Sequence, residues 1–153
     1  MYQLAGRHGS MYTLVANDGR GLAITGQREW ADYRVSAIIR PHMAEEVGLA
    51  GHVQGLERYY ALLLQADGHL RLLKRGPGSS GATEEQVLAE RAEPWDLDRP
   101  YRFALQFGAG TITARLNERQ AFSVTDAYQP LSAGAIGLLV TAGRADVDEV
   151  SIY

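Results

Sequence analysis

The alternation of apolar and polar residues is clearest in the stretch 51–75, which predicts a β-hairpin. Two runs, 58–65 and 69–74, flank the short turn Ala66-Asp67-Gly68, whose glycine can adopt a positive φ. Because both faces of each run are partly apolar, we expect this hairpin at the centre of a sheet. One face of the first run carries Tyr60, Leu62 and Leu64, and the other carries Tyr59, Ala61, Leu63 and Gln65.

A second alternating stretch, 101–124, predicts a three-stranded meander. Its strands, 101–107, 111–116 and 120–124, are separated by turns that contain Gly108, Gly110 and Asn117. The same alternation over 33–40 predicts a further strand, which Pro41 ends. In the meander the residues expected to face inward include Tyr101, Phe103, Leu105 and Phe107.

Shorter apolar runs predict the remaining strands. The turn cluster Asn17-Asp18-Gly19 separates the first two of them, and Met43–Glu46 fits one helical turn. The segment 83–93 fits either structure: Thr83 to Gln86 match a capping box, whereas 87–92 also fits a strand. We favour the strand because an isolated two-turn helix is weak. The shorter runs lie at 11–15, 22–25, 47–54, 135–141 and 147–153.

About twelve strands and no long helix predict an all-β fold, an antiparallel sandwich of two packed sheets. The 153 residues suit one domain, which a longer protein could also contain as a module. The chain has no cysteine, so disulfides and thiolate metal sites are excluded. The net charge of −3 comes from interspersed charges, which argues against a nucleic-acid partner.

No apolar run is long enough to span a membrane, so we expect no membrane partner. The N-terminal residues lack the apolar segment of a signal peptide, which favours the cytoplasm without deciding the compartment.

Several motifs, taken in order, resemble one family of sandwiches. Trp30-Ala31-Asp32-Tyr33 leads into a long strand, and Arg58-Tyr59-Tyr60 opens a hairpin that ends in Leu72-Leu73-Lys74. The meander, the run from Ala135 to Val140, and the terminal Asp148 to Ile152 follow. This order resembles the concanavalin A-like jelly roll in its laminin-G-like and bacterial carbohydrate-binding versions. More narrowly, it is similar to the C-terminal β-sandwich of bacterial ADP-ribosylglycohydrolase-type proteins.

The resemblance implies a sugar site on a concave sheet or on the loops at its rim. Aromatic rings stack on pyranose faces, although Tyr60 and Trp95 could equally be core aromatics, and His52 could be a structural histidine. Lys74 is a further candidate, but strict alternation places it on the opposite face of the hairpin from Arg71. The predicted ligand-binding residues are His52, Gln54, Tyr60, Arg71 and Trp95.

Metal binding has one candidate site, a structural calcium at Asp146 and Asp148, because calcium takes carboxylate oxygens. The alternative, a solvated start of a strand, is favoured because no dense Asp/Asn loop accompanies these residues. The four histidines are scattered, which argues against zinc, and no other cofactor is expected.

No catalytic spacing is present in the sequence. The Glu-x-Asp-x-x-Glu motif of laminarinase-type relatives, the nucleophile elbow and the phosphate-binding loops are all missing. We therefore expect a non-catalytic, carbohydrate-binding-like accessory module whose partners are a glycan or glycoside-like small molecule and a fused catalytic domain. The alternatives are a structural or oligomerisation domain without ligand and, third, a sugar-active hydrolase.

Overall fold

The computed structural model describes residues 2–3 and 12–153, and this part of the chain contains strands and no helix. No helix long and apolar enough to cross a membrane therefore occurs within these ranges. All strand pairs are antiparallel, which confirms the predicted all-β sandwich. The strands are β1 (Tyr2–Gln3), β2 (Tyr12–Thr25), β3 (Tyr33–Met43), β4 (Glu46–Gly55), β5 (Arg58–Gln65), β6 (His69–Pro77), β7 (Thr83–Ala92), β8 (Tyr101–Gly108), β9 (Thr111–Leu116), β10 (Arg119–Thr125) and β11 (Ala135–Ile152).

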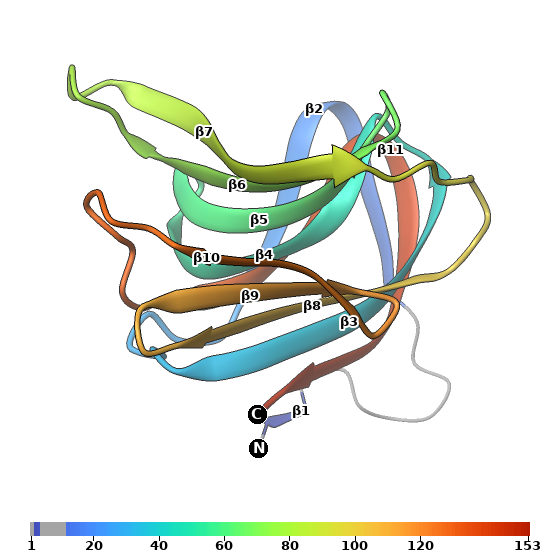
Figure 1. The fold of residues 1–153 in the computed structure, drawn as a ribbon. Helices are drawn as coiled ribbons and strands as arrows, with labels where there is room; N and C mark the ends of the chain where they lie inside the picture. Colours follow the sequence, from blue (N-terminus) through green and yellow to red (C-terminus); the bar gives the residue numbers. More distant parts are fainter. Residues whose placement is uncertain (1, 4–11) are drawn as a thin grey trace.

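Two layers face each other and share the long strand β11 (Figure 1). The first layer has the order β10-β9-β8-β3 and continues into the second half of β11. The second layer has the order β4-β5-β6-β7 and begins at the first half of β11, whose other side pairs with β2. The main core lies between the layers and includes Val35, Leu49, Leu62, Phe103 and Ile136, all with no exposed surface.

The strand β11 passes from one layer to the other at Ala142 and Gly143. Ala142 has a φ of 48°, and the register with β2 shifts between Thr141 and Gly143. A Cβ on Gly143 would overlap the carbonyl oxygen of Met43, so the corner requires glycine. Opposite this corner, the predicted turn Asn17-Asp18-Gly19 bulges within β2 without ending it.

Within residues 2–3 and 12–153, eleven strands replace the predicted twelve, because two pairs of predicted runs merge and the unpredicted β1 is added. The runs 135–141 and 147–153 belong to the one strand β11, and 12–15 and 22–25 belong to β2, while Met11 lies outside the described residues. The helical turn predicted for Met43–Glu46 is wrong, because β3 extends to Met43 and β4 begins at Glu46. The strand favoured over 83–93 is confirmed as β7, which pairs with β6.

The hairpin β5–β6 lies between β4 and β7, and both of its faces are buried as predicted. Tyr60, Leu62 and Leu64 face the main core. The opposite face forms a second, smaller cluster on the outer side of the layer. Burying each leucine contributes roughly 1.5–3 kcal/mol, so a layer with two apolar faces is held firmly in place. The second cluster contains Ala50, Val53, Tyr59, Ala61, Leu63, Leu73, Ala135 and Leu139.

Candidate functional site

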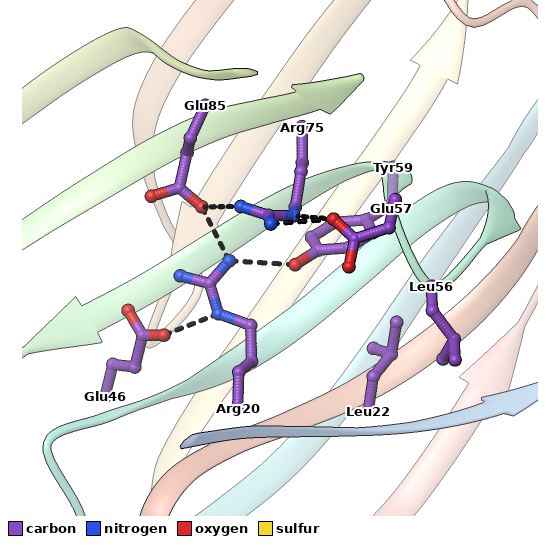
Figure 2. Close-up of a pocket in the computed structure, with 8 residues that line it drawn as sticks. All are labelled: Arg20, Leu22, Glu46, Leu56, Glu57, Tyr59, Arg75 and Glu85. Carbon is purple, nitrogen blue, oxygen red and sulfur yellow. Dashed lines mark hydrogen bonds and ion pairs between the residues drawn. The ribbon is translucent and has the colours of Figure 1, made fainter. Parts of the chain in front are cut away.

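The second layer curls so strongly that its two edge strands face each other across its outer side. Arg20 on β2 and Glu85 on β7 are separated in the sheet by β11, β4, β5 and β6. Nevertheless, the Nη1 atom of Arg20 lies 2.6 Å from the Oε1 atom of Glu85 (Figure 2). The outer side of this layer is therefore a concave hollow, and its floor includes Tyr59 of the second apolar cluster and Leu22, which packs against that cluster.

Arg20 is the centre of the polar network over this floor. Its Nε donates to Glu46 Oε1 at 2.6 Å, and its Nη1 donates to the Tyr59 hydroxyl at 2.8 Å (Figure 2). Glu46 also accepts hydrogen bonds from Gln65 Nε2 at 2.8 Å and from Thr141 Oγ1 at 2.7 Å. These contacts hold the guanidinium and the carboxylate in fixed orientations.

A second arginine extends the network toward the rim. Arg75 on β6 contacts Glu57 Oε2 at 2.7 Å and Glu85 Oε1 at 3.7 Å. Glu57 lies in the turn between β4 and β5, and both Glu57 and Glu85 are exposed, Glu57 more than Glu85. The hollow thus alternates guanidinium donors with carboxylate acceptors from its floor to its mouth.

The protonation states of the network follow from these contacts. Burial raises the pKa of Glu46, but its hydrogen bonds from Arg20, Gln65 and Thr141 outweigh burial and hold that pKa below its usual range. Burial raises the pKa of Tyr59 above its ordinary value, so the phenol is neutral at pH 7. The hollow therefore presents an ionised carboxylate and a neutral hydroxyl.

The hollow has a volume of about 390 Å³, within the range of small-ligand sites. Leu22 and Leu56 supply its apolar wall, and Leu56 is 66% exposed at the mouth. Such a wall, opposite paired donors and acceptors, suits a ligand with hydroxyl groups on a carbon ring. The lining residues are Arg20, Leu22, Glu46, Leu56, Glu57, Tyr59, Arg75 and Glu85.

Two of the predicted ligand-binding residues, His52 and Tyr60, lie between the layers and not on the concave side. The β4 backbone is irregular at His52, which has a φ of 45°, and the register with β5 shifts between Gly51 and Gly55. The His52 ring therefore turns inward and stacks on Phe107 at 3.8 Å between ring centroids. His52 and Tyr60 line a separate cavity of about 370 Å³ at one end of the sandwich, where ligand binding stays a prediction.

The other predicted residues are engaged in contacts within the fold. Arg71 faces the concave side, opposite in face to the buried Lys74 as predicted, and it pairs with Asp67 at 2.8 Å and Glu90 at 2.6 Å. Gln54 Nε2 donates to the Ala133 carbonyl at 2.9 Å, and Trp95 Nε1 donates to the Gln65 carbonyl at 2.7 Å.

The candidate calcium residues Asp146 and Asp148 do not converge. Asp146 accepts a hydrogen bond from Thr13 and contacts His42 Nε2 at 2.6 Å, while Asp148 accepts one from the Glu149 amide. Over residues 2–3 and 12–153, no three acidic, histidine or cysteine side chains gather closely enough to hold a metal. The calcium site stays a prediction, and the carboxylates of Asp146 and Asp148 are poorly arranged to bind one calcium ion together.

Sequence reasoning missed all five charged residues that line the hollow. One row across β5, β6 and β7 contains Tyr59, Arg75 and Glu85. The short turn of the β5–β6 hairpin sets the register that places Tyr59 opposite Arg75, so this pair could have been identified from the sequence. The strand favoured within 83–93 was expected over 87–92, which left Glu85 outside it, whereas β7 begins at Thr83. No local pattern could identify Arg20, because its partners lie on strands distant in sequence.

No protein-family model matches this chain, and no curated protein matches it in sequence. Among solved structures, the carbohydrate binding module CBM66 from Bacillus subtilis matches with a TM-score of 0.74 at 18% identity, over 90% of this chain and 83% of that one.

Two further structures have the same architecture. Domain 4 of AbnA, a GH43 extracellular arabinanase from Geobacillus stearothermophilus solved with arabinotriose, matches with a TM-score of 0.66 at 20% identity, over 99% of this chain and 73% of that one. The Caenorhabditis elegans galectin LEC-6 matches with a TM-score of 0.60 at 12% identity, over 92% and 95%. At these identities the likeness shows the jelly-roll fold, in agreement with the architecture predicted from the sequence.

Proposed function

We propose that this protein is a non-catalytic carbohydrate-binding module whose ligand enters the concave hollow. The observation that carries the proposal is the hollow itself, in which two arginines and three glutamates lie beside the apolar side chains of Leu22 and Leu56. The fold supports it, because a carbohydrate binding module and a galectin share this architecture. The proposal includes a fused catalytic domain as a partner. Its type would be that of ADP-ribosylglycohydrolase-type proteins, whose C-terminal β-sandwich the sequence resembles.

Recognition would depend on hydrogen bonds more than on stacking. Tyr59, the aromatic residue of the lining, is only 1% exposed and offers no ring face to a sugar. Arg75 and Glu57 are accessible at the mouth, and a guanidinium has five donors while a carboxylate has about four lone-pair sites. Sugar hydroxyls both donate and accept, so they match this mixed lining better than an ion of one sign.

A hydrolase is less well supported by the same residues. A glycosidase needs a carboxylic acid of raised pKa to protonate the leaving group. The pKa of Glu46 is lowered, and Glu57 and Glu85 each contact a guanidinium. The lowered pKa of Glu46 favours an ionised carboxylate that accepts hydrogen bonds over a proton donor.

One observation favours the alternative of an oligomerisation domain. The ten-residue strand β7 ends its layer, and Val87 on it is 48% exposed. A sheet edge can pair with a second copy, although Glu84, Glu90 and Arg91 place charges there that oppose such pairing. A stable dimer in light scattering that Val87→Lys dissociates would favour this alternative.

The proposal is tested with a glycan array of neutral oligosaccharides that includes arabinotriose, followed by isothermal titration calorimetry of the best binder. Arg75→Gln and Glu57→Gln are each expected to weaken binding about tenfold or more, because a hydrogen bond to a charged group contributes roughly 1.5–3 kcal/mol. Glu29→Gln, an exposed carboxylate outside the lining, is the matched control and should bind normally.

Two results would contradict the proposal. One is an array without any saturable binder. The other is binding that both lining variants leave unchanged. If Tyr60→Phe weakens the binding instead, the ligand site lies in the cavity at the end of the sandwich.

A further inference from the structure

Three arginines surround a second hollow on the outer side of the first layer, which we call the arginine pit. Arg34 on β3, Arg102 on β8 and Arg115 on β9 line a cavity of about 310 Å³. Ser36 and Ala104, neighbours in the register of β3 and β8, are buried beneath the three arginines. Because both side chains are small, they leave room for the cavity that the three arginine side chains line. Glu118 and Tyr153 complete the lining.

Among the described residues, the ion pairs of the arginine pit are confined to one of its three arginines. Arg102 contacts Glu149 at 3.2 Å and Glu118 at 3.8 Å. Arg115 donates only to the neutral amide of Gln106, at 3.1 Å, among the contacts of the described residues. Two of the three guanidiniums, those of Arg34 and Arg115, therefore have no carboxylate partner among the described residues.

Arg34 is the least satisfied member of the arginine pit. Within the described part of the chain its guanidinium enters no ion pair, and its Nε is buried without a hydrogen-bond acceptor. Buried polar groups nearly always have a partner, so this Nε–H is a donor that still lacks an acceptor among the described residues.

We propose that the arginine pit binds a tetrahedral oxyanion, a sulfate or phosphate group. Guanidinium forks match the oxygen spacing of such groups, and charge-assisted hydrogen bonds are the strong class. A tetrahedral group presents oxygens in three directions toward three arginines, whereas a carboxylate presents two in one plane. The group can be the free ion or an ester carried by a sugar, and this site is separate from the concave hollow.

The test is calorimetric and thermal-shift titration of the whole chain with sodium sulfate and sodium phosphate, against sodium chloride at equal ionic strength. Sulfate or phosphate is expected to bind saturably and to raise Tm beyond chloride, and Arg34→Gln and Arg115→Gln are each expected to weaken binding about tenfold. Arg58→Gln, an exposed arginine on β5 in the other layer, removes the same charge and should leave binding unchanged.

Titration with glucose 6-sulfate and with glucose separates the two sources of the anion. Tighter binding of the ester than of inorganic sulfate identifies a sulfated sugar, whereas equal binding identifies the free ion. A Tm rise that chloride matches, or equal weakening by Arg58→Gln, overturns the proposal. If a variant fails to fold, the Arg34 Nε–H resonance of the unaltered protein must shift saturably with sulfate, and a resonance that stays fixed overturns the proposal equally.

Discussion

A buried ion pair anchors the loop that follows β10. Lys74 Nζ lies 2.6 Å from Asp126 Oδ2 and donates to the carbonyls of Tyr128 and Gln129. The Tyr60 hydroxyl also donates to Asp126, at 2.7 Å. The loop is therefore fixed to the inner face of β5 and β6 by Lys74 and Tyr60. Ligand binding by Tyr60 stays a prediction.

Replacing one member of this pair should destabilise the protein strongly. Asp126→Asn leaves the Lys74 charge buried without a counterion, which costs about 3–5 kcal/mol in the free energy of unfolding. Urea denaturation measures this loss. The double variant Lys74→Met with Asp126→Leu should lose much less, and a single variant as stable as the original protein would contradict the interpretation.

His42 makes stability depend on pH near neutrality. Hydrogen bonds from its ring to Asp146 and then Asp98 raise the pKa of His42 above its usual value. A raised folded-state pKa gives stability that is fully present below the unfolded value of about 6.5 and is lost as pH rises through the folded pKa.

We therefore expect the difference in unfolding free energy between the original protein and His42→Gln to shrink from pH 5.5 to pH 8.5. Chemical denaturation at a series of pH values measures this difference. A difference that is constant across the range would show that the two contacts do not depend on imidazole protonation.

At the scale of the strand, the corner of β11 should tolerate no side chain at Gly143. A Cβ there meets the backbone of Met43 and Ala44, which cannot rotate away, so Gly143→Ala should cost about 1–3 kcal/mol or more. Thermal unfolding followed by circular dichroism measures the loss. Gly76→Ala on β6, where a Cβ meets nothing within 4 Å, is the control and should leave Tm nearly unchanged.

The strands that the sequence predicted well are those defined by local signals. Alternation and a short turn define the hairpin 58–74, so its faces and its central place in the sheet were correct. Asn17-Asp18-Gly19 is an equally strong turn signal, yet pairing with β11 makes it a bulge in one strand. The concave surface was expected from the resemblance, but the side chains that reach it were not. The positive φ of His52 turns its ring inward, and the contact between Glu85 and Arg20 joins strands that are distant in sequence.

At the scale of the whole molecule, the pairing of distant segments should make folding slow. Tyr12 pairs with Val147, and both layers need β11 before either is complete. Sandwiches dominated by such long-range pairs fold in milliseconds to seconds. Stopped-flow refolding from urea should therefore show a main phase in this range, and a microsecond phase that accounts for the full signal would contradict this expectation.

The short strand β1 pairs with the last residues of β11, with Tyr2 opposite Ile152 (Figure 1). The two ends of the polypeptide consequently emerge as neighbours, on the side away from β7. A host protein could therefore receive this sequence within one of its surface loops without separating the two halves of that loop. Such a graft would leave the Arg20–Glu85 bridge, and the hollow beneath it, pointing outward from the host.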